Sequence, residues 1–131
     1  MTDRELVQTA LAMRNFSHAP HSNFRVGAAL LCADGRVFTG CNVESAAYGC
    51  TICAERTALF KAVSEGCTDG FAAIAIAGQG PEYCWPCGAC RQLLFEFAPD
   101  LRVLAAREDG GWQESTMEEL LPHGFGAKNL T

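Results

Sequence analysis

Two short cysteine-bearing stretches constrain this chain more than any other feature of its sequence. The first contains Cys53, and the second contains Cys87 and Cys90, which are three residues apart. If each stretch opens a helix, Cys87 and Cys90 share one helical face, and the helix starts favour thiolates over thiols. Three thiolates fill three positions of a tetrahedral zinc ion and leave the fourth for water, which is the arrangement of a catalytic site.

Two charged residues beside Cys53 extend this interpretation. Glu55 lies two residues further on and can lean over the metal without binding it. A carboxylate beside an acidic zinc-bound water is a device for hydrolysis, because it can take up and return a proton. Arg56 is predicted to donate a charge-assisted hydrogen bond to a thiolate, offsetting the surplus negative charge of a three-thiolate zinc site.

The order Cys-x-Glu followed by Pro-Cys-x-x-Cys resembles the signature of the zinc nucleoside and nucleobase deaminases. The resemblance covers nearly the whole chain and is closest to the small homotetrameric cytidine deaminases of pyrimidine salvage, within the cytidine and deoxycytidylate deaminase family. It implies a hydrolase with one Zn²⁺ per subunit. The implied reaction converts cytidine and 2′-deoxycytidine to uridine and 2′-deoxyuridine and releases ammonia. An alternative within the class is deamination of a related aminated nucleoside or nucleoside antibiotic.

The resemblance also implies substrate contacts. Asn42 and Glu44 resemble the side chains that hold the ribose, and Phe24 resembles the aromatic residue near the pyrimidine. The backbone N–H of Ala54 is expected at a helix start, where it could bind the carbonyl of the base.

Another set of residues resembles those that a neighbouring subunit contributes to the active site. They are Ala46, Tyr48 and Phe125. The resemblance therefore implies a homotetramer whose active sites are completed by neighbouring subunits.

The order of local signals predicts an α/β fold. The capping box Thr2-x-x-Glu5 opens a first helix that ends before Pro20, and Asp34-Gly35 indicates a hairpin turn. Ser115-x-x-Glu118 is expected to open a last short helix. The remaining elements are expected strands at 26–32, 36–43, 71–77, 101–106 and 111–114, and helices at 53–65 and 87–97.

These elements predict a mixed sheet of about five strands with helices on its faces. The first two strands should be antiparallel, and the strand–helix–strand segment 71–106 should form a right-handed parallel crossover. The family resemblance implies a three-layer α/β/α arrangement. With 131 residues, we expect a single catalytic domain over residues 1–131.

Charge and hydropathy exclude several classes of partner. The net charge is −5, and no dense run of Lys and Arg could follow a phosphate backbone, so nucleic acid is not expected as a partner. A small nucleoside fits better. We expect no membrane partner and a cytoplasmic location, because no apolar run approaches a membrane span and the N-terminus lacks the order of a signal peptide.

The cysteines leave one serious rival open, which is not an enzyme. Cys50-x-x-Cys53 and Cys87-x-x-Cys90 together match a structural four-cysteine zinc module. Such a site would occupy the position needed for water. It would leave no purpose for Glu55.

The other cysteines have simpler interpretations. Cys84 with the two cysteines of the second stretch could act as redox thiols. Cys32, Cys41 and Cys67 are interpreted as small apolar residues that fill the core, since free cysteine is often buried.

Overall fold

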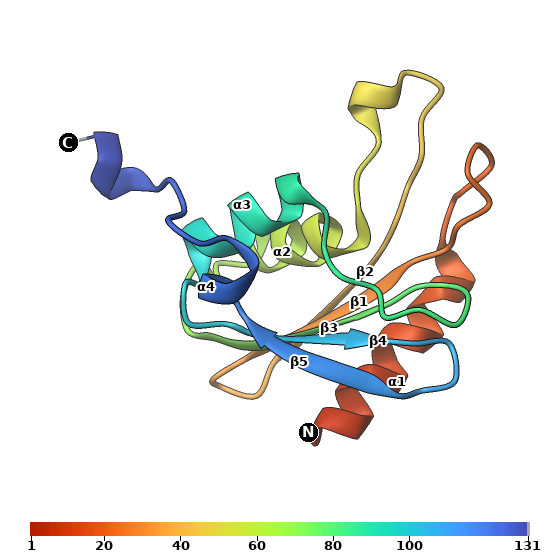
Figure 1. The fold of residues 1–131 in the computed structure, drawn as a ribbon, viewed down its shortest axis with the longest axis horizontal. Coiled ribbons are helices and arrows are strands. Elements are labelled where there is room, and N and C mark those ends of the chain that lie inside the picture. The colour runs from red at the N-terminus through yellow and green to blue at the C-terminus, as the bar shows by residue number, and fades with distance from the viewer. Residues whose placement is uncertain (131) are drawn as a thin grey trace.

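A computed structural model describes residues 1–130 and shows one mixed sheet of five strands (Figure 1). The strand order is β2-β1-β3-β4-β5. β3 and β4 are parallel, and the other neighbours are antiparallel, which confirms both pairing predictions. Residue 131 of the predicted domain lies outside the described residues. The strands are β1 Gly27–Cys32, β2 Val37–Cys41, β3 Phe71–Ala77, β4 Arg102–Ala106 and β5 Trp112–Thr116.

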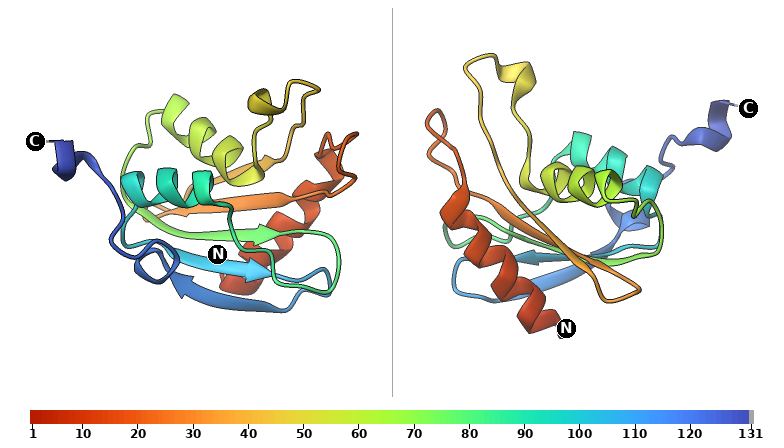
Figure 2. Two further views of the ribbon diagram at one scale, coloured as in Figure 1. Left: turned by 45° about the horizontal axis from the view of Figure 1, so that its top comes forward. Right: turned by 180° about the vertical axis from the view of Figure 1, so that it is seen from behind.

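Helices cover both faces of this sheet (Figure 2), as the three-layer prediction requires. α1, Asp3–Met13, lies on one face. α2, Ala54–Ser64, and α3, Gly88–Phe97, lie on the other face, beside the short α4, Met117–Leu120. Three single-turn 3₁₀ segments complete the described elements: η1 Arg14–Phe16, η2 Tyr48–Cys50 and η3 Ala127–Leu130.

The central strand β3 carries small side chains on the face covered by α1 and bulkier side chains on the face covered by α2 and α3. Its side chains alternate between the faces, as in any strand. Ala73 and Ala75 are buried against α1, so this helix can lie close to the backbone. Ile74 and Ile76 are buried in the second core, beneath α2 and α3, where bulkier side chains fill the wider space. The strand is buried on both faces, which accounts for its almost wholly apolar sequence.

A glycine allows α2 to lie directly on strand β2. A Cβ atom at Gly40 would meet the backbone of the helix, at the carbonyl oxygen of Ala54 and at 2.6 Å from the amide nitrogen of Ala58. The first turn of α2 is therefore held against this strand. This contact fixes the end of the helix that carries the first cysteine stretch.

The strand register brings three loop starts to one edge of the sheet. Gly27, the first residue of β1, pairs with Cys41 at the end of β2 and with Ala77 at the end of β3. Ala77 in turn pairs with Ala106 at the end of β4. Both α2 and α3 begin after strands that end at this edge. Open α/β sheets place their ligands at such an edge.

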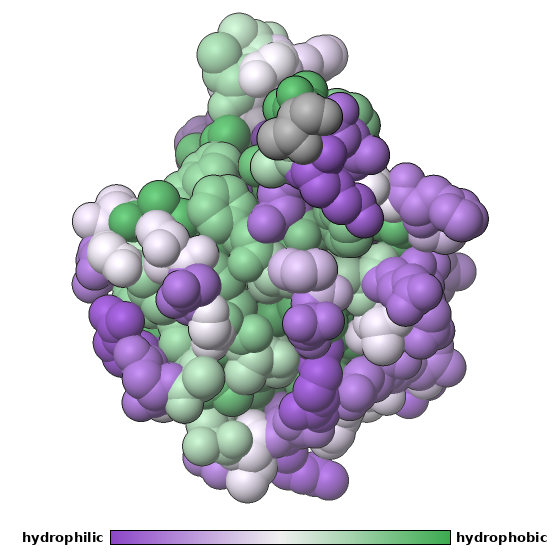
Figure 3. Space-filling model, turned by 90° about the vertical axis from the view of Figure 1, so that its left-hand side faces the viewer, coloured by the Kyte–Doolittle hydropathy of each residue, from purple (hydrophilic) through white to green (hydrophobic). Residues whose placement is uncertain are grey.

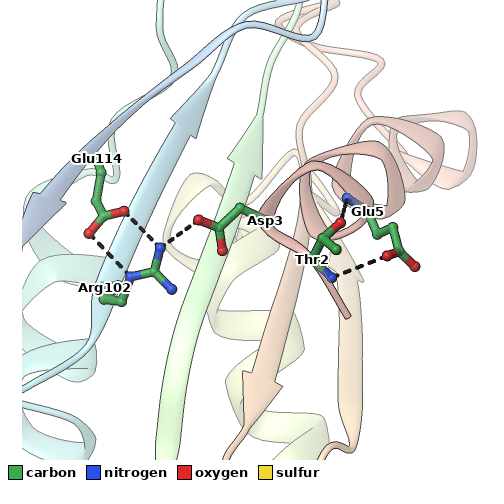
Figure 4. Close-up of polar contacts among 5 residues, drawn as sticks. All are labelled: Thr2, Asp3, Glu5, Arg102 and Glu114. Atoms are coloured by element: carbon green, nitrogen blue, oxygen red, sulfur yellow. Dashed lines mark hydrogen bonds and ion pairs between the residues drawn. The ribbon is translucent and has the colours of Figure 1, made fainter.

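The start of α1 is fixed by two sets of polar contacts (Figure 4). Thr2 and Glu5 form the predicted capping box, each bonding the backbone N–H of the other. Arg102 on β4 donates to Asp3 at 2.6 Å and to Glu114 on β5 at 2.8 Å. The arginine thus connects the first helix to the last two strands.

Some predicted boundaries are wrong, and the pairing pattern explains why. β2 ends at Cys41, because the N–H of Val26 bonds to the side chain of Asn42 rather than to its backbone, and Val43 bridges to His18 and Ile52. The last helix is capped by Thr116, whose side chain accepts from the N–H of Glu119. The predicted cap used the preceding residue, Ser115, and Glu118.

Strand alternation explains this shift by one residue. β5 extends to Thr116, two residues beyond the predicted end, and Ser115 is buried whereas Thr116 is exposed. Thr116 therefore has the free side chain that can cap the helix.

Within residues 1–130, no helix combines the length and the apolar character that crossing a bilayer requires.

Candidate active site

The three predicted metal ligands meet at the starts of two helices. Cys53 is the N-cap of α2, Cys87 is the N-cap of α3, and Cys90 lies in the first turn of α3. The sulfur of Cys87 lies 3.7 Å from that of Cys53 and 3.5 Å from that of Cys90, and all three sulfurs lie within 4.8 Å of one another. Among residues 1–130, this is the single group of three or more potential metal-ligating side chains.

The spacing of these sulfurs fits a tetrahedral zinc ion. Zinc–thiolate bonds of about 2.3 Å place two sulfurs on a tetrahedral ion about 3.8 Å apart. Thiolates are also a donor set that zinc prefers. Cys50 is exposed in η2 and does not belong to the group that the described residues form, so the four-cysteine module is not assembled. Three protein ligands leave the fourth position of a tetrahedral ion for a non-protein ligand such as water.

Hydrogen bonds stabilise the thiolate form of Cys53. Bonding to the Cys90 thiol and to the Arg56 guanidinium lowers the pKa of Cys53 to about 5, against the opposing effect of burial. The Nη2 atom of Arg56 lies 3.5 Å from the Cys53 sulfur. Arg91, the other arginine beside a ligand, bonds instead to the carbonyl oxygens of Pro86 and Leu120.

Glu55 lies in the first turn of α2 and is only 4% exposed. Burial raises the pKa of its carboxyl to about 7, and the negative charge of Cys53 adds to this effect. A carboxyl group with such a pKa is present in both protonation states near neutral pH. It can therefore both accept and donate a proton.

Most of the predicted site residues face one cavity of about 320 Å³ beside the cysteines. They come from α2, from the start of α3 and from the two loops at the same edge of the sheet. Aromatic, aliphatic and sulfur-containing side chains form much of the wall. The cavity is lined by Ser22, Phe24, Val26, Asn42, Glu44, Thr51, Cys53, Ala54, Glu55, Cys84, Trp85 and Cys87.

Asn42 is buried and organises the loop that carries Phe24. Its Oδ1 atom accepts from the N–H of Val26 at 3.0 Å, and its Nδ2 atom donates to the carbonyl oxygen of Phe24 at 2.8 Å. One hydrogen of Nδ2 and one lone pair of Oδ1 remain for another partner. Asn42 thus has a structural role that the sequence spacing did not reveal.

Glu44 is held by the loop between α1 and β1. Its Oε1 atom accepts from the N–H groups of His21 and Ser22, and its Oε2 atom accepts from the Ser22 hydroxyl. These bonds, with those of Ser22 first, lower the pKa of Glu44. The carboxylate is therefore ionised and fixed at the mouth of the cavity, where it can accept from a hydroxyl group.

The structure does not bring Ala46, Tyr48 and Phe125 into the cavity. Tyr48 is 79% exposed in η2 and packs edge-to-face against His21, with ring centroids 6.3 Å apart. Phe125 is 54% exposed on the C-terminal tail. The tail and η2 project from separate sides of the molecule in both Figure 1 and Figure 2.

Several wall residues were not predicted from the sequence. Cys84 and Trp85 directly precede the Pro-Cys-x-x-Cys stretch, and this position next to the ligands is the sequence signal that could have indicated their place in the cavity wall. Ser22, Val26 and Thr51 carried no comparable signal.

Comparisons with known proteins agree with this geometry. The family described as "Cytidine and deoxycytidylate deaminase zinc-binding region" matches residues 1–106. The cytidine deaminase of Halalkalibacterium halodurans is 48% identical, with 98% of each chain covered. A probable cytidine deaminase of Dictyostelium discoideum is 44% identical, covering 99% of this chain and 90% of that protein. The crystal structure of cytidine deaminase from Burkholderia pseudomallei superposes with a TM-score of 0.92 at 47% identity, covering 95% of this chain and 100% of that one.

Proposed function

The chain belongs to the cytidine and deoxycytidylate deaminase family, and from this premise we propose that it hydrolyses cytidine and 2′-deoxycytidine to the corresponding uridines and ammonia. The observation that carries the proposal is the meeting of three cysteine sulfurs beside a cavity that the buried Glu55 also lines. In this reading, residues 1–131 act as one catalytic domain in pyrimidine salvage. We expect the enzyme to work in the cytoplasm, where its free thiols would stay reduced.

The zinc ion would be held by Cys53, Cys87 and Cys90. When bound, it supplies Lewis-acid chemistry that makes water a nucleophile at neutral pH. Glu55 takes one proton from the attacking water and delivers it to the ring nitrogen of the pyrimidine, and it then carries the second proton, from the newly added hydroxyl group, to the departing amino group. Arg56 offsets the negative charge of the thiolates by donating to Cys53.

The cavity offers a complementary contact for each part of a nucleoside. Phe24 would contact the pyrimidine with its aromatic ring, and the N–H of Ala54, in the first turn of α2, would bind the base carbonyl. Glu44 and the free hydrogen and lone pair of the Asn42 amide would bind ribose hydroxyls. The acidic chain, with its net charge of −5, suits a neutral nucleoside better than a polynucleotide.

A homotetramer would account for the site residues that lie outside the cavity. Tyr48 and Phe125 are large, exposed and apolar, and Ala46 lies in the same projecting loop as Tyr48. Figure 3 shows hydrophobic residues over much of the face next to the C-terminal end. Exposed apolar areas of this kind mark protein interfaces. We expect sedimentation to give four times the 14.1 kDa mass of the chain. A monomeric active enzyme would contradict the shared active site.

The decisive experiment compares the wild-type enzyme with Glu55→Gln. Loss of the cytosine absorbance band should follow when zinc-loaded wild-type protein meets cytidine or 2′-deoxycytidine. In Glu55→Gln, turnover should fall by about 10²–10⁴-fold while zinc stays bound, because the proton carrier is removed and the ligands are not.

A matched control is Glu65→Gln, since Glu65 is an exposed carboxylate at the opposite end of α2. It should keep wild-type turnover. Failure of the zinc-loaded wild-type protein to deaminate either nucleoside would overturn the proposal. If only another aminated nucleoside were consumed, the substrate would be a nucleoside antibiotic or a related compound.

A further inference from the structure

A second pair of cysteines lies in close contact away from the metal ligands. Cys32 ends strand β1, and Cys67 follows the C-terminal end of α2. Their sulfur atoms are 3.1 Å apart, and the residues are only 3% and 5% exposed. The sequence alone predicted both as core filler, so their proximity is a property of the fold.

The separation of these two sulfurs distinguishes them from the ligand cysteines. The ligand sulfurs are 3.5 and 3.7 Å apart, close to the spacing on a tetrahedral ion, whereas 3.1 Å is too short for two ligands of one zinc ion. A disulfide has a sulfur–sulfur bond of about 2.05 Å. The two sulfur atoms therefore need to approach by about 1 Å to form that bond.

The backbone around each cysteine holds it in place. The β1–β3 register shifts at Cys32, and the following N–H, of Ala33, bonds to the carbonyl oxygen of Gly70 at 2.7 Å. The N–H of Cys67 bonds to the carbonyl oxygen of Ala62 in the last turn of α2 at 2.9 Å. Both sulfur atoms are thus presented by backbone that is fixed by hydrogen bonds.

The pair borders a depression on the protein surface. Cys32 and Cys67 both line a depression of about 210 Å³ between the β1–β2 turn and the loop before β3, next to the polar side chains of Asp34 and Asp69. Such a depression admits a molecule the size of hydrogen peroxide. The two cysteines are neither metal ligands nor part of the substrate cavity.

We propose that Cys32 and Cys67 form a reversible intramolecular disulfide that fastens the β1–β2 hairpin to the C-terminal end of α2. With hydrogen peroxide as oxidant, two S–H bonds break and one S–S bond forms. The two thiols lose two electrons and two protons, and the peroxide is reduced to two molecules of water. Because the bond would close the loop from residue 32 to residue 67, it constrains the unfolded chain and stabilises the fold.

The environment of the two sulfurs affects the rate of oxidation. Burial, and then the contact with Cys67, raises the pKa of Cys32 to about 12. The thiol of Cys67 donates to the carbonyl oxygen of Asp69. One thiol is oxidised to the sulfenic acid, and the other displaces water from it. Because thiolates are the reactive species and Cys32 must react in one of these two steps, we expect the reaction to be slow compared with that of a redox sensor.

The test treats the zinc-loaded full-length protein with hydrogen peroxide and maps disulfides in non-reduced peptides. The expected result is a peptide that contains a Cys32–Cys67 link. The midpoint of thermal unfolding should rise by about 5–10 °C and return to its starting value with dithiothreitol. Deaminase turnover should stay within twofold, because the link lies outside the substrate cavity.

Single variants separate this pair from the other thiols. Cys32→Ala and Cys67→Ala should each abolish the rise in midpoint, whereas Cys41→Ala, a half-buried cysteine on the neighbouring strand β2, should keep it. The peptide map of the wild-type protein tests the link even if the variants fold poorly. Free Cys32 and Cys67 under conditions that oxidise the exposed Cys50 would overturn the proposal, as would a link that leaves the unfolding midpoint unchanged.

Discussion

At the scale of single residues, the cavity depends on buried polar groups that would be costly without partners. Asn42 has both ends of its amide bonded to backbone, and Glu55 is buried where its charged form is disfavoured. A buried polar group that loses its partner costs about 1–3 kcal/mol. A change at Asn42 should therefore affect stability and activity together, whereas Glu55→Gln should act mainly on turnover.

Asn42→Ala should raise KM for cytidine and lower the free energy of unfolding by about 1–3 kcal/mol. The change leaves the N–H of Val26 and the carbonyl oxygen of Phe24 without their partner, so the loop that carries the aromatic wall is released. Denaturant unfolding and steady-state kinetics measure the two effects. Asn15→Ala, at an exposed asparagine, serves as control and should stay within about 0.5 kcal/mol. A variant with wild-type KM and stability would show that Asn42 holds neither loop nor substrate.

Arg56→Ala should weaken zinc binding by about 10–100-fold, because the side chain that donates to the Cys53 thiolate is removed. Arg56→Lys should fall between wild type and alanine, since lysine keeps the charge but not the geometry of the guanidinium. Competition with a chromophoric chelator measures the affinity. Arg36→Ala, at an exposed arginine paired with Asp34, is the control and should bind zinc normally. Equal zinc affinities for all of these proteins would show that Arg56 does not contribute to zinc binding.

At the scale of secondary-structure elements, both cysteine helices are positioned by what precedes and underlies them. α2 lies on Gly40 of β2, and α3 follows β3, whose end pairs with the start of β1 and with the end of β4. On the opposite face, α1 is fixed by its capping box and by the contact between Asp3 and Arg102. The helix on the opposite face from the cysteine helices is thus tied to strand β4.

Arg102→Ala should lower the free energy of unfolding by about 1 kcal/mol or less, since Arg102, Asp3 and Glu114 are all partly exposed and their charges are screened by solvent. Bonding to Arg102 lowers the pKa of Glu114 in the folded protein. A lowered folded-state pKa gives stability that is present above the unfolded value, about 4.3, and is lost as pH falls through the folded value. The difference between variant and wild type should therefore shrink below about pH 4.

Chemical unfolding at several pH values tests this dependence. High salt at neutral pH should also reduce the difference, because it screens the charges. A difference that grew towards acid pH would show that the Asp3–Arg102–Glu114 contacts do not contribute as charged pairs.

At the scale of the whole molecule, the sequence could predict the features that depend on local signals, such as helix starts and the direction of a strand pairing. The capping box placed α1, the cysteine stretches placed the starts of α2 and α3, and the strand–helix–strand order required the parallel pairing of β3 with β4. Each of these depends on neighbouring residues or on the handedness of a connection. Ligands and helix starts were therefore predictable together.

Features that depend on how distant segments meet could not be predicted. Cys84 and Trp85 face the cavity because the loop before α3 folds back, with the N–H of Cys84 bonded to the carbonyl oxygen of Ala106 on β4. The contact between Cys32 and Cys67 likewise joins a strand end to a helix end, far apart in the sequence. Sequence position suggested only that Cys84 and Trp85 lie near the ligands, and no residue type or spacing indicated the contact between Cys32 and Cys67, because such contacts follow from tertiary packing.

Removal of zinc should separate the fold from the chemistry. The two hydrophobic cores are built from side chains other than Cys53, Cys87 and Cys90, so the layers remain packed when the ligands lose their ion. Zinc binds the folded state, and its loss should lower the midpoint of thermal unfolding, by the equivalent of about 4 kcal/mol if zinc had been present at a thousandfold its dissociation constant. The stripped protein should have no deaminase activity and an unchanged far-UV circular dichroism spectrum at 25 °C.

One equivalent of zinc per chain should restore both activity and the unfolding midpoint. A structural four-cysteine module behaves differently, because its folding free energy comes from the metal and chelation unfolds it. Collapse of the circular dichroism signal on chelation would therefore indicate that the cysteines hold the fold together. Retention of the signal with reversible loss of activity is expected here, because the metal would join the starts of two helices whose packing against the sheet is already secured by Gly40 and by the central strand β3.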